Sequence, residues 1–371
     1  MKLLLVSPYS KRKVGGIGTW SKSILDYVQT DSEVNLKFQN TKSFVKKFAP
    51  KKGSKLSRLI FNSLDTVFII TKLFFSLLFF RPDVVHFTSS ASLALHKDKV
   101  AVFLTKKIFR RKIVLHWHFG RMPQICDTKG WEYNMLMKVV NASDASIVID
   151  YSSYTALKAE GIEKVYYVPN PITKAINDAA VSVNPLEIAS NRESGTILFV
   201  GHLLKDKGLF ELVEACTQIK EVSKLVVVGF GAPGIQYELM SIAKTRDNGE
   251  WLEFTGDLKR EDVFEHYKKC SVFCLPSYTE GFPYVVLEAM SFGAPIVATA
   301  VGAIPEMLSE NCGVVIGIKS VEQIVNAVSD LLTNKEKAIA MGNNAHNKVF
   351  GNFTIDIVYK QYKNVWIKAN C

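Results

Sequence analysis

Residues 272–299 read VFCLPSYTEGFPYVVLEAMSFGAPIVAT and contain, in order, an apolar run, a loop, a helix-length segment and a second apolar run. This is the order of a βαβ unit, in which a helix joins two parallel strands. Pro283 suits the first helical position, Gly293 suits the C-terminal cap, and Pro295 prevents the helix from continuing. We therefore predict a helix over 283–292 between two buried strands.

The same alternation of short apolar runs with helix-length patterns extends outward through almost the whole chain. Such alternation is typical of parallel sheets that carry helices on both faces. The sequence therefore predicts an α/β fold with two doubly wound parallel-sheet domains. The strands that we predict are Leu3–Val6, Val84–Phe87, Ile113–His116, Ser146–Ile149, Thr196–Val200, Lys224–Gly229, Trp251–Phe254, Val272–Pro276, Ile296–Thr299 and Val314–Ile316.

A domain boundary is predicted shortly after Pro169 and Pro171, which remove backbone donors and disfavour helix in the residues before them. The residues that follow lack a sustained period, and a chain of 371 residues is long enough for two or three hydrophobic cores. The domains that we expect are an N-terminal Rossmann-like domain over 1–172, a linker over 173–194, a C-terminal Rossmann-like domain over 195–350, and a terminal helix over 351–371 that crosses back to the N-terminal domain.

The net charge of +11 is divided unevenly, because residues 1–180 carry +15 and residues 181–371 carry −4. The six cysteines show neither a zinc-module spacing nor a disulfide framework, so we expect a reduced, cytoplasmic protein. The most apolar stretch, Val67–Phe80, is shorter than the roughly 20 residues that cross a bilayer. We expect neither a signal peptide nor a transmembrane helix.

Two loops that follow predicted strands have the composition of anion sites. Gly15 and Gly16 lie in a glycine-rich turn before a helix that we expect to begin near Thr19, and its backbone amides could hold an anion. His202 and Lys207 lie in a second loop, where cationic side chains meet a positive helix end, an arrangement that suits a diphosphate. Each loop could equally be a structural turn.

Two glutamates lie in the segment quoted first. Glu280 belongs to the loop at the helix entrance, whereas Glu288 lies among apolar residues of the helix itself. A carboxylate in such surroundings needs a partner. For either residue alone, the simpler interpretation is an acidic helix cap or an exposed helix glutamate.

The predicted strand over 113–116 continues into Trp117 and His118. His116 and His118 share a face because side chains in a strand alternate, and His118 lies nearer the carboxyl end of the sheet, where ligands bind in parallel-sheet proteins. We expect His116 to be a core histidine. A zinc site made of His116, His118 and Cys126 has no second cluster of ligands to complete it.

Taken together, these loops resemble the retaining GT-B glycosyltransferases of family 4, the group 1 glycosyltransferases. The long motif EGFPYVVLEAM, in which seven residues separate Glu280 from Glu288, followed by Gly293 and Pro295, is similar to the motif of that family. Other features occur in the order of the family: the Gly15-Gly16 loop, the strand ending at His118, the Pro169-Asn170-Pro171 boundary, the Val228-Gly229-Phe230-Gly231 turn and the segment 301–306. The resemblance covers essentially the whole chain and implies a GT-B fold, with two Rossmann-like domains facing a central cleft.

The resemblance also implies roles for matching positions. Glu288 would bind the ribose hydroxyls of a nucleotide, and Glu280 with the amides of Gly281 and Phe282 would meet the donor sugar and diphosphate. Lys207 would neutralise the departing phosphates. The N-terminal domain would then be the acceptor side, and the C-terminal domain would bind the nucleotide sugar.

Further roles fall on the N-terminal domain and on one position that departs from the family. The loop of Gly15 and Gly16 would assist with the phosphates, and His118 would contact the donor sugar. His202 stands where the family usually has an arginine, so a bidentate fork is replaced by a smaller group that titrates near neutral pH. His118, Lys207 and Glu280 are thus the predicted catalytic residues.

The expected reaction is transfer of a hexosyl group from a UDP- or GDP-sugar. A nucleoside diphosphate leaves with added negative charge, which fixed cations and amides must stabilise. The chain has no Asp-x-Asp motif, so we expect no metal and no other cofactor. Three alternatives remain: a glycosidase that uses Glu280 and Glu288, a nucleotide-sugar epimerase of the same fold, and a membrane-surface binding protein with a degenerate site.

A basic segment points to the acceptor. Seven Lys or Arg residues and no acidic residue occur between Thr41 and Arg58, beside aromatic side chains. Such segments suit an anionic membrane surface, whereas no nucleic-acid-binding motif is present. We expect a lipid-linked or oligosaccharide acceptor and a peripheral location on the cytoplasmic face of the membrane. The residues predicted to bind the membrane are Lys46, Lys47, Lys51 and Lys52.

Overall fold

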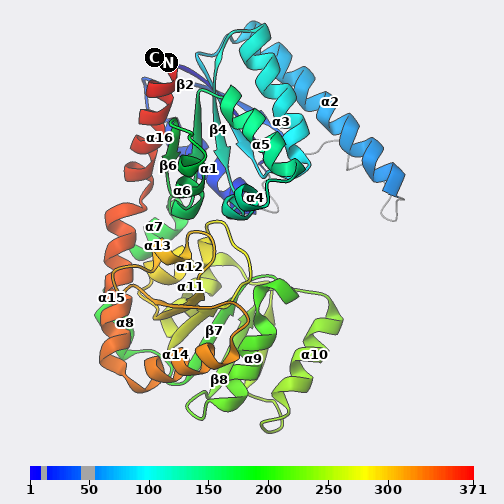
Figure 1. Ribbon diagram of the computed structural model, residues 1–371. Helices are drawn as coiled ribbons and strands as arrows, with labels where there is room; N and C mark the ends of the chain where they lie inside the picture. Colours follow the sequence, from blue (N-terminus) through cyan, green and yellow to red (C-terminus); the bar gives the residue numbers. More distant parts are fainter. Residues whose placement is uncertain (10–14, 43–54) are drawn as a thin grey trace. The chain divides into compact units, whose positions relative to one another are not determined.

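The computed structural model describes residues 1–9, 15–42 and 55–371, which form two compact units (Figure 1). Unit 1 comprises Met1–Pro171 and Ile355–Cys371, and unit 2 comprises Ile172–Thr354. Each unit contains one six-stranded sheet in which every neighbouring pair is parallel. The predicted α/β fold with two doubly wound sheets is therefore confirmed.

The sheet of unit 1 has the strand order β2-β1-β3-β4-β5-β6. Its strands are β1 (Lys2–Ser7), β2 (Asn35–Asn40), β3 (Val84–Ser89), β4 (Lys112–Trp117), β5 (Ala145–Val148) and β6 (Val165–Tyr167). The four strands predicted from their apolar runs lie in the middle of this sheet. The two strands that were not predicted, β2 and β6, form its edges.

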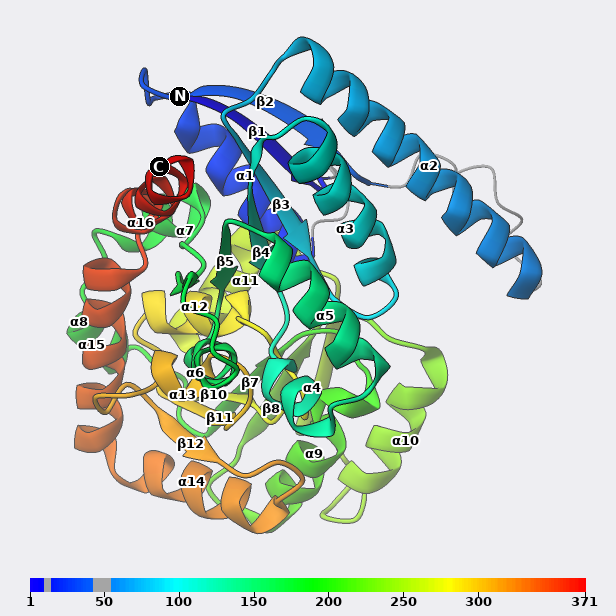
Figure 2. The ribbon, with the colours of Figure 1, turned by 45° about the horizontal axis from the view of Figure 1, so that its top comes forward.

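Helices cover both faces of this sheet (Figures 1 and 2). One core contains Leu4 and Phe87 from the sheet with Leu73, Leu95 and Leu136 from the helices over it. The helices of this face and of the loops beside it are α2 (Lys55–Phe79), α3 (Ala94–Phe103), the π-helix η2 (Leu104–Ile108), α4 (Met122–Thr128), α5 (Trp131–Ala142) and α6 (Tyr151–Ala159).

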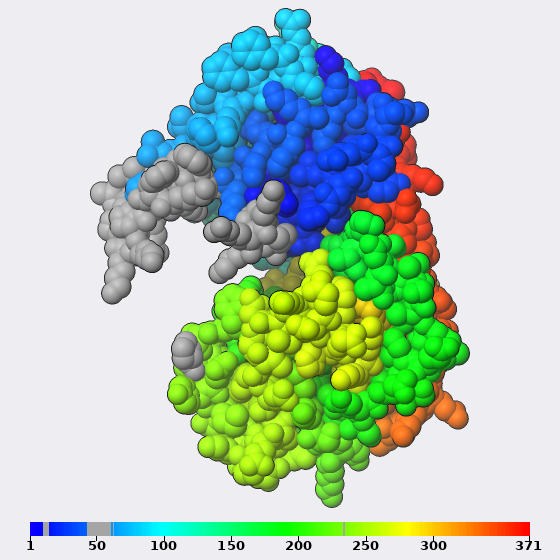
Figure 3. Space-filling view, turned by 180° about the vertical axis from the view of Figure 1, so that it is seen from behind, coloured from blue at the N-terminus to red at the C-terminus, as the bar shows by residue number. Residues whose placement is uncertain are grey.

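The opposite face of the unit 1 sheet is covered by α1 (Gly16–Val28) and α16 (Ile355–Asn370). Leu3 and Leu5 point to this side and pack with Trp20 of α1 and Trp366 of α16. The terminal helix of the chain therefore belongs to unit 1, although it follows unit 2 in the sequence. Figure 3 shows α16, in red, against the N-terminal residues in blue.

The sheet of unit 2 has the order β12-β11-β10-β7-β8-β9. Its strands are β7 (Thr196–Val200), β8 (Lys224–Val228), β9 (Leu252–Gly256), β10 (Val272–Leu275), β11 (Ile296–Thr299) and β12 (Val314–Ile316). Its helices are α7 (Lys174–Ala180), α8 (Pro185–Ser190), the 3₁₀ turn η3 (Lys205–Lys207), α9 (Leu209–Gln218), α10 (Pro233–Ala243), α11 (Arg260–Lys269), α12 (Tyr284–Ser291), α13 (Ile304–Met307), α14 (Val321–Thr333) and α15 (Lys335–Asn352).

The strand order reverses between β7 and β10, which are neighbours in unit 2 but far apart in the sequence. Their connections leave in opposite directions along the sheet, so the loops at their carboxyl ends lie side by side. In open parallel sheets this switch point is where ligands bind. The topology therefore places the loop after β7 next to the loop after β10.

The stretch 173–194, expected as a linker, instead holds α7 and α8, which belong to unit 2. The side chains of Thr173 and Asn184 cap the two helices by accepting backbone N–H groups. Helices of seven and six residues are too short to show a helical period in the sequence, and for this reason the prediction missed them.

Two predicted helix starts differ from the structure by one to three residues. Pro283 is the N-cap of α12 with an extended backbone, so the helix begins at Tyr284. α1 begins at Gly16, three residues before the predicted start at Thr19, with Gly15 as its N-cap. Among the residues that the structure describes, no helix has the combined length and apolarity needed to cross a bilayer.

Candidate functional site

A partly buried ion pair lies where the loops after β7 and β10 meet. Lys207, at the end of η3, donates from Nζ to Oε1 of Glu280 at 2.7 Å. The two side chains are 22% and 13% exposed, so water screens the pair only in part. The backbone N–H of Tyr278 also donates to the carbonyl of Asp206 at 2.8 Å and fixes one loop against the other.

Backbone donors lie directly beside this ion pair. The N–H groups of Gly281 and Phe282 have no acceptor within the described part of the chain. Gly281 is held from its other side, because its carbonyl accepts from Ala303 N–H at 2.8 Å. Unpaired amides at the entrance of a helix, next to a lysine, are suited to an anion.

Glu288 lies on α12 and has one protein partner. Tyr267 of α11 donates its hydroxyl to Oε2 at 3.1 Å, and the other carboxylate oxygen has no hydrogen-bond partner among the described residues. Burial raises the pKa of Glu288 to about 7, against a smaller lowering by the charge of Arg260 and by the Tyr267 hydrogen bond. The carboxylate oxygen of Glu288 that Tyr267 does not contact can therefore accept a hydrogen bond from a ligand hydroxyl.

His202 lies in the loop after β7 and packs its ring edge against Phe230, with centroids 4.7 Å apart. The next residue, Leu203, forms an isolated bridge with Gly231, so this loop is joined to the loop after β8. The structure thus brings Lys207 and Glu280 into direct contact, whereas the imidazole of His202 lies against an aromatic ring.

In unit 1, the described part of the glycine-rich loop consists of Gly15 and Gly16, at the start of α1. Both glycines are exposed, and a Cβ atom added to either would meet nothing within 4 Å among the described residues. The loop therefore offers an accessible helix N-terminus. The predicted membrane residues Lys46, Lys47, Lys51 and Lys52 lie outside the described residues.

His118 follows β4 and belongs to a cluster of three histidines with His86 and His116. The rings of His116 and His118 lie with their centroids 3.9 Å apart, and Trp20 of α1 packs against all three. His86 and His116 are fully buried. The prediction that His116 is a core histidine is confirmed.

A directed chain of hydrogen bonds enters this cluster from the terminal helix. Trp366 donates its Nε1–H to Nδ1 of His86 at 2.8 Å, and Nε2 of His86 lies 3.2 Å from Nδ1 of His116. Indole is a donor only, so His86 carries its proton on Nε2 and His116 in turn carries its proton on Nε2. The Nε2 atoms of His116 and His118 are buried without a partner in the described structure.

The three rings are uncharged at neutral pH. Burial lowers the pKa of His86 to about 3, and burial together with His86 lowers the pKa of His118 to about 3. Burial and the two neighbouring rings hold the pKa of His116 well below its usual value. In the part of the chain that is described, no group of three or more His, Cys, Asp or Glu residues could hold a metal ion.

Sequence reasoning missed the partners that hold these groups. Tyr267 and Arg260 act on Glu288 from α11, and Trp366 reaches His86 from a helix that follows the other unit. The sequence carries a partial signal for Trp366, which lies on the apolar stripe of the terminal helix. No spacing rule connects Tyr267 with Glu288.

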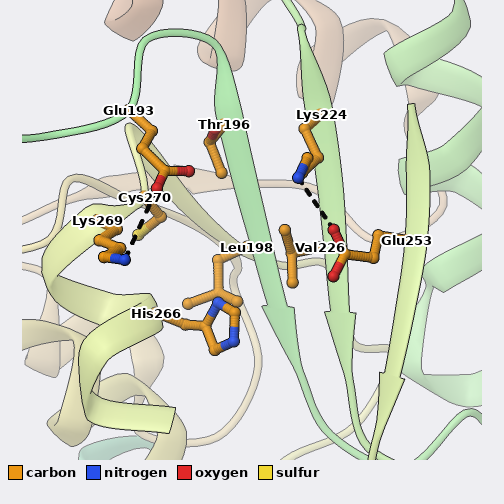
Figure 4. Close-up of a pocket in the computed structure, with 9 residues that line it drawn as sticks. All are labelled: Glu193, Thr196, Leu198, Lys224, Val226, Glu253, His266, Lys269 and Cys270. Carbon is orange, nitrogen blue, oxygen red and sulfur yellow. Dashed lines mark ion pairs between the residues drawn. The ribbon is translucent and has the colours of Figure 1, made fainter. Parts of the chain in front are cut away.

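A small cavity of about 140 Å³ lies at the opposite end of the unit 2 sheet (Figure 4). Thr196 and Lys224 line it from the first residues of β7 and β8, whereas the ion pair of Lys207 follows the carboxyl end of β7. Lys224 pairs with Glu253 at 3.0 Å. This cavity is separate from the candidate site.

Residues 184–348 match the model of the family described as glycosyl transferases group 1. The sequence resemblance to group 1 glycosyltransferases is therefore confirmed over this region, which contains Lys207, Glu280 and Glu288. The match names neither family 4 nor a retaining outcome, and both remain predictions.

Curated relatives align with part of this chain. A putative teichuronic acid biosynthesis glycosyltransferase, TuaC, of Bacillus subtilis is 30% identical over 132 residues, covering 36% of this chain and 31% of the relative. A GDP-mannose-dependent alpha-(1-6)-phosphatidylinositol monomannoside mannosyltransferase of Mycobacterium tuberculosis is 31% identical over 161 residues, covering 40% and 41%. The chain thus spans less than half the length of these two relatives.

A similar fold occurs in a solved structure. The Anabaena protein HepE in complex with UDP matches with a TM-score of 0.70 at 18% identity, over 98% of this chain and 99% of that chain. This likeness concerns the fold, which is GT-B: two Rossmann-like parallel-sheet units. The two Rossmann-like parallel-sheet units implied by the resemblance are therefore confirmed.

The histidine cluster predicts two observations. Nitrogen-15 spectra of the histidine rings should show His86 and His116 with the proton on Nε2, and neither ring nor His118 should titrate between pH 5 and pH 8. The unfolded chain binds protons that these native rings exclude, so the free energy of unfolding of unit 1 should fall as the pH drops from about 6.5 towards about 3. A ring of the cluster that titrates above pH 6 would contradict this assignment.

Glu288→Gln should weaken nucleotide binding roughly 10- to 100-fold, because hydrogen bonds to a charged group contribute about 1.5–3 kcal/mol. The raised pKa of Glu288 means that its ionisation lowers the stability of unit 2 as the pH rises from about 4.5 to about 7. The variant should therefore melt at a higher temperature than the wild type above pH 7. Calorimetry with UDP and GDP measures the first effect and thermal scans at two pH values measure the second. Glu265→Gln, at an exposed position of α11, is the control. An unchanged dissociation constant in Glu288→Gln would remove Glu288 from the site.

Proposed function

We propose that this protein is a retaining glycosyltransferase that moves a hexosyl group from a UDP- or GDP-sugar to a lipid-linked or oligosaccharide acceptor. The observation that carries the proposal is the partly buried Lys207–Glu280 pair beside the free amides of Gly281 and Phe282. The match of residues 184–348 to group 1 glycosyltransferases supports it.

The chemistry of the leaving group fits this arrangement. As the glycosidic bond breaks, negative charge grows on the diphosphate, and a cation held at a fixed position stabilises that charge without reorganising. Lys207 is such a cation, because Glu280 and the loop of η3 hold it in place before a donor arrives. The amides of Gly281 and Phe282, which follow Glu280 in the chain, add their dipoles to this arrangement.

Glu280 changes partner in the proposed reaction. In the described structure its carboxylate neutralises Lys207 at 2.7 Å. A bound diphosphate takes over the ammonium group of Lys207, and the carboxylate of Glu280 becomes free to accept hydrogen bonds from hydroxyls of the donor sugar. Glu288 accepts from the ribose hydroxyls through the oxygen that Tyr267 leaves free.

Lysine and amides suffice for the proposed charge stabilisation, so the proposed mechanism needs no metal. His118 contributes as an uncharged group, since burial and His86 lower its pKa to about 3. A neutral imidazole can hydrogen-bond a sugar hydroxyl or carbonyl without adding charge near the anomeric carbon.

The nature of the donor and acceptor is proposed from the relatives. One relative is named for GDP-mannose and phosphatidylinositol monomannoside, a second for teichuronic acid biosynthesis, and the HepE structure holds UDP. The first name and the UDP complex support a nucleotide-sugar donor, and the two relatives' names support an acceptor of a polysaccharide or glycolipid pathway.

An exposed stripe on α2 favours docking of unit 1 at a membrane. Its apolar side chains recur at intervals of three and four residues, which places them on one side of the helix, away from the buried Leu73 and Leu77. Lys72 lies beside the stripe, with Nζ 4.3 Å from the ring centroid of Phe68. The stripe consists of Leu64, Val67, Phe68, Phe75, Leu78 and Phe79.

We propose that this stripe and the preceding basic segment contact an anionic membrane surface. Apolar side chains on a helix bind the boundary between lipid headgroups and chains, and nearby lysines bind the anionic headgroups. Phe79 is 74% exposed and stacks on Phe75 of the same stripe with ring centroids 6.1 Å apart, so the stripe presents a contiguous apolar patch of the kind that marks interaction sites.

Lys207→Ala should lower turnover roughly 100- to 1000-fold, the scale for one preorganised donor to a developing charge. The assay is release of nucleoside diphosphate from UDP- and GDP-hexoses with a polysaccharide or lipid acceptor. Lys224→Ala is the matched control, because it breaks an ion pair of the same sheet at the opposite end. Turnover should survive a chelator. Near-wild-type turnover of Lys207→Ala would contradict the role of Lys207. Inhibition by chelator that Mg²⁺ reverses would contradict the mechanism without a metal.

Liposome sedimentation should show binding that rises with the fraction of anionic lipid and falls with added salt, because the Debye length is about 8 Å at physiological ionic strength. Replacing Phe75 and Phe79 together with serine should lower binding at every salt concentration. Val315→Ser with Ile318→Ser, two exposed apolar positions of unit 2, should leave it unchanged.

Changing Lys46, Lys47, Lys51 and Lys52 together to glutamine should weaken the salt-dependent part of this binding, since each basic residue near the surface contributes roughly 1 kcal/mol. Nucleotide affinity should stay the same in all these variants. Equal binding to neutral and anionic vesicles would overturn the electrostatic part of the proposal.

A further inference from the structure

A groove of about 530 Å³ lies at the β6 edge of the unit 1 sheet, and none of the residues predicted for the donor site lines it. Its walls come from α6, from the edge strand β6 and from α16, all parts of unit 1. Figure 1 shows these three elements side by side. The volume falls in the range of small-molecule sites, which is roughly 300–1,000 Å³.

Tyrosines form one wall of the groove. Tyr151 and Tyr154 stack at the start of α6, with ring centroids 5.4 Å apart. Tyr151 also meets Tyr167 of β6 edge to face, with centroids 6.2 Å apart, and Tyr166 lines the groove beside it. Tyr151 is 52% exposed, so a large part of an aromatic ring remains open to a ligand.

Two amides form the facing wall. Gln361 and Asn364 are three residues apart on α16 and therefore lie on the same side of the helix. Neither side-chain amide has a hydrogen-bond partner among the described residues. Each amide offers both donors and an acceptor, which is the pattern that a hydroxyl needs from its partner.

The charge of the lining is balanced. Lys158 is its one cation and Glu163 its one carboxylate, and Lys158 Nζ already donates to the backbone carbonyl of Glu163 at 2.8 Å. The lining residues therefore carry no surplus charge to attract a nucleotide, a phosphate or an anionic headgroup, although Lys368 stands outside the lining with Nζ 5.5 Å from the ring centroid of Tyr166. Aromatic faces, free amides and a neutral lining select an uncharged polar ligand with apolar faces.

We propose that this groove binds a short, uncharged oligosaccharide. A hexose ring presents a face of C–H groups, which packs on an aromatic ring, and a rim of hydroxyls, which pairs with amides. Tyr151 and Tyr167 take the sugar faces, and Gln361 and Asn364 take the hydroxyls. The groove would hold a glycan chain on unit 1 independently of the transfer reaction, so the inference does not rest on the proposed donor chemistry.

The test uses the full chain and four probes, the uncharged trisaccharides of glucose, galactose, mannose and N-acetylglucosamine. Saturation-transfer NMR identifies a trisaccharide that binds, and a titration up to about 10 mM gives its dissociation constant. Tyr151→Ala should weaken binding roughly two- to tenfold, which corresponds to the loss of one aromatic contact. Gln361→Ala with Asn364→Ala should weaken it by at least as much.

Tyr237→Ala is the matched control, because Tyr237 is a 77% exposed tyrosine on α10 of unit 2. It should leave trisaccharide binding unchanged, and all groove variants should bind UDP and GDP like the wild type, which separates this groove from the donor site. The proposal is overturned if none of the four trisaccharides binds, or if binding survives both groove variants. It is also overturned if an extended, uncharged peptide binds along β6, if this binding is lost in Tyr151→Ala, and if no trisaccharide shows the same dependence.

Discussion

Two close backbone contacts hold the loops of unit 2 in the arrangement on which its candidate site depends. A Cβ atom on Gly208 would lie 2.0 Å from the carbonyl oxygen of Pro276, and one on Gly302 would lie 2.4 Å from that of Glu280. Both glycines also have positive φ angles, which side chains disfavour. These contacts press the loops after β7, β10 and β11 together, and only then does Lys207 reach Glu280. The ion pair is thus a consequence of backbone packing that glycine alone permits.

Burial sets the charge of the candidate groups in opposite ways in the two units. In unit 1, apolar surroundings and Trp20 keep three histidines neutral, and the hydrogen bond from Trp366 fixes which nitrogen carries the proton. In unit 2, the same physical effect makes the ionised form of Glu288 costly, and Tyr267 offsets that cost only in part. Both arrangements leave a polar atom without a protein partner. Such atoms are expected where a ligand completes the hydrogen bonds, because a buried polar atom without a partner destabilises the fold.

The sequence predicted all six strands of the unit 2 sheet and the four central strands of the unit 1 sheet, but it missed the two edge strands of unit 1. Central strands such as β7 and β11 are short apolar runs, which burial on both faces demands. The edge strands β2 and β6 were not predicted, because β2 mixes polar with apolar residues and β6 has only three residues. Lys207, Glu280 and Glu288 could be proposed from the sequence because their loops follow strands or lie in one continuous motif. Their partners Tyr267 and Arg260 could not be, since contacts between helices far apart in the sequence leave no spacing to detect.

The two units therefore differ in how much of their chemistry a sequence can carry. The loops of unit 2 must approach each other backbone to backbone, so glycine, proline and glutamate are required at fixed spacings, and the family match covers residues 184–348. The recognition surfaces proposed for unit 1 are built differently. The stripe on α2 needs only apolar side chains at helical intervals, and the tyrosine groove joins α6, β6 and a helix that follows the other unit in the sequence. Many sequences satisfy such requirements. The proposed donor site of unit 2 depends on fixed spacings, whereas the proposed surfaces of unit 1 do not, and for this reason the acceptor proposal rests on surfaces rather than on motifs.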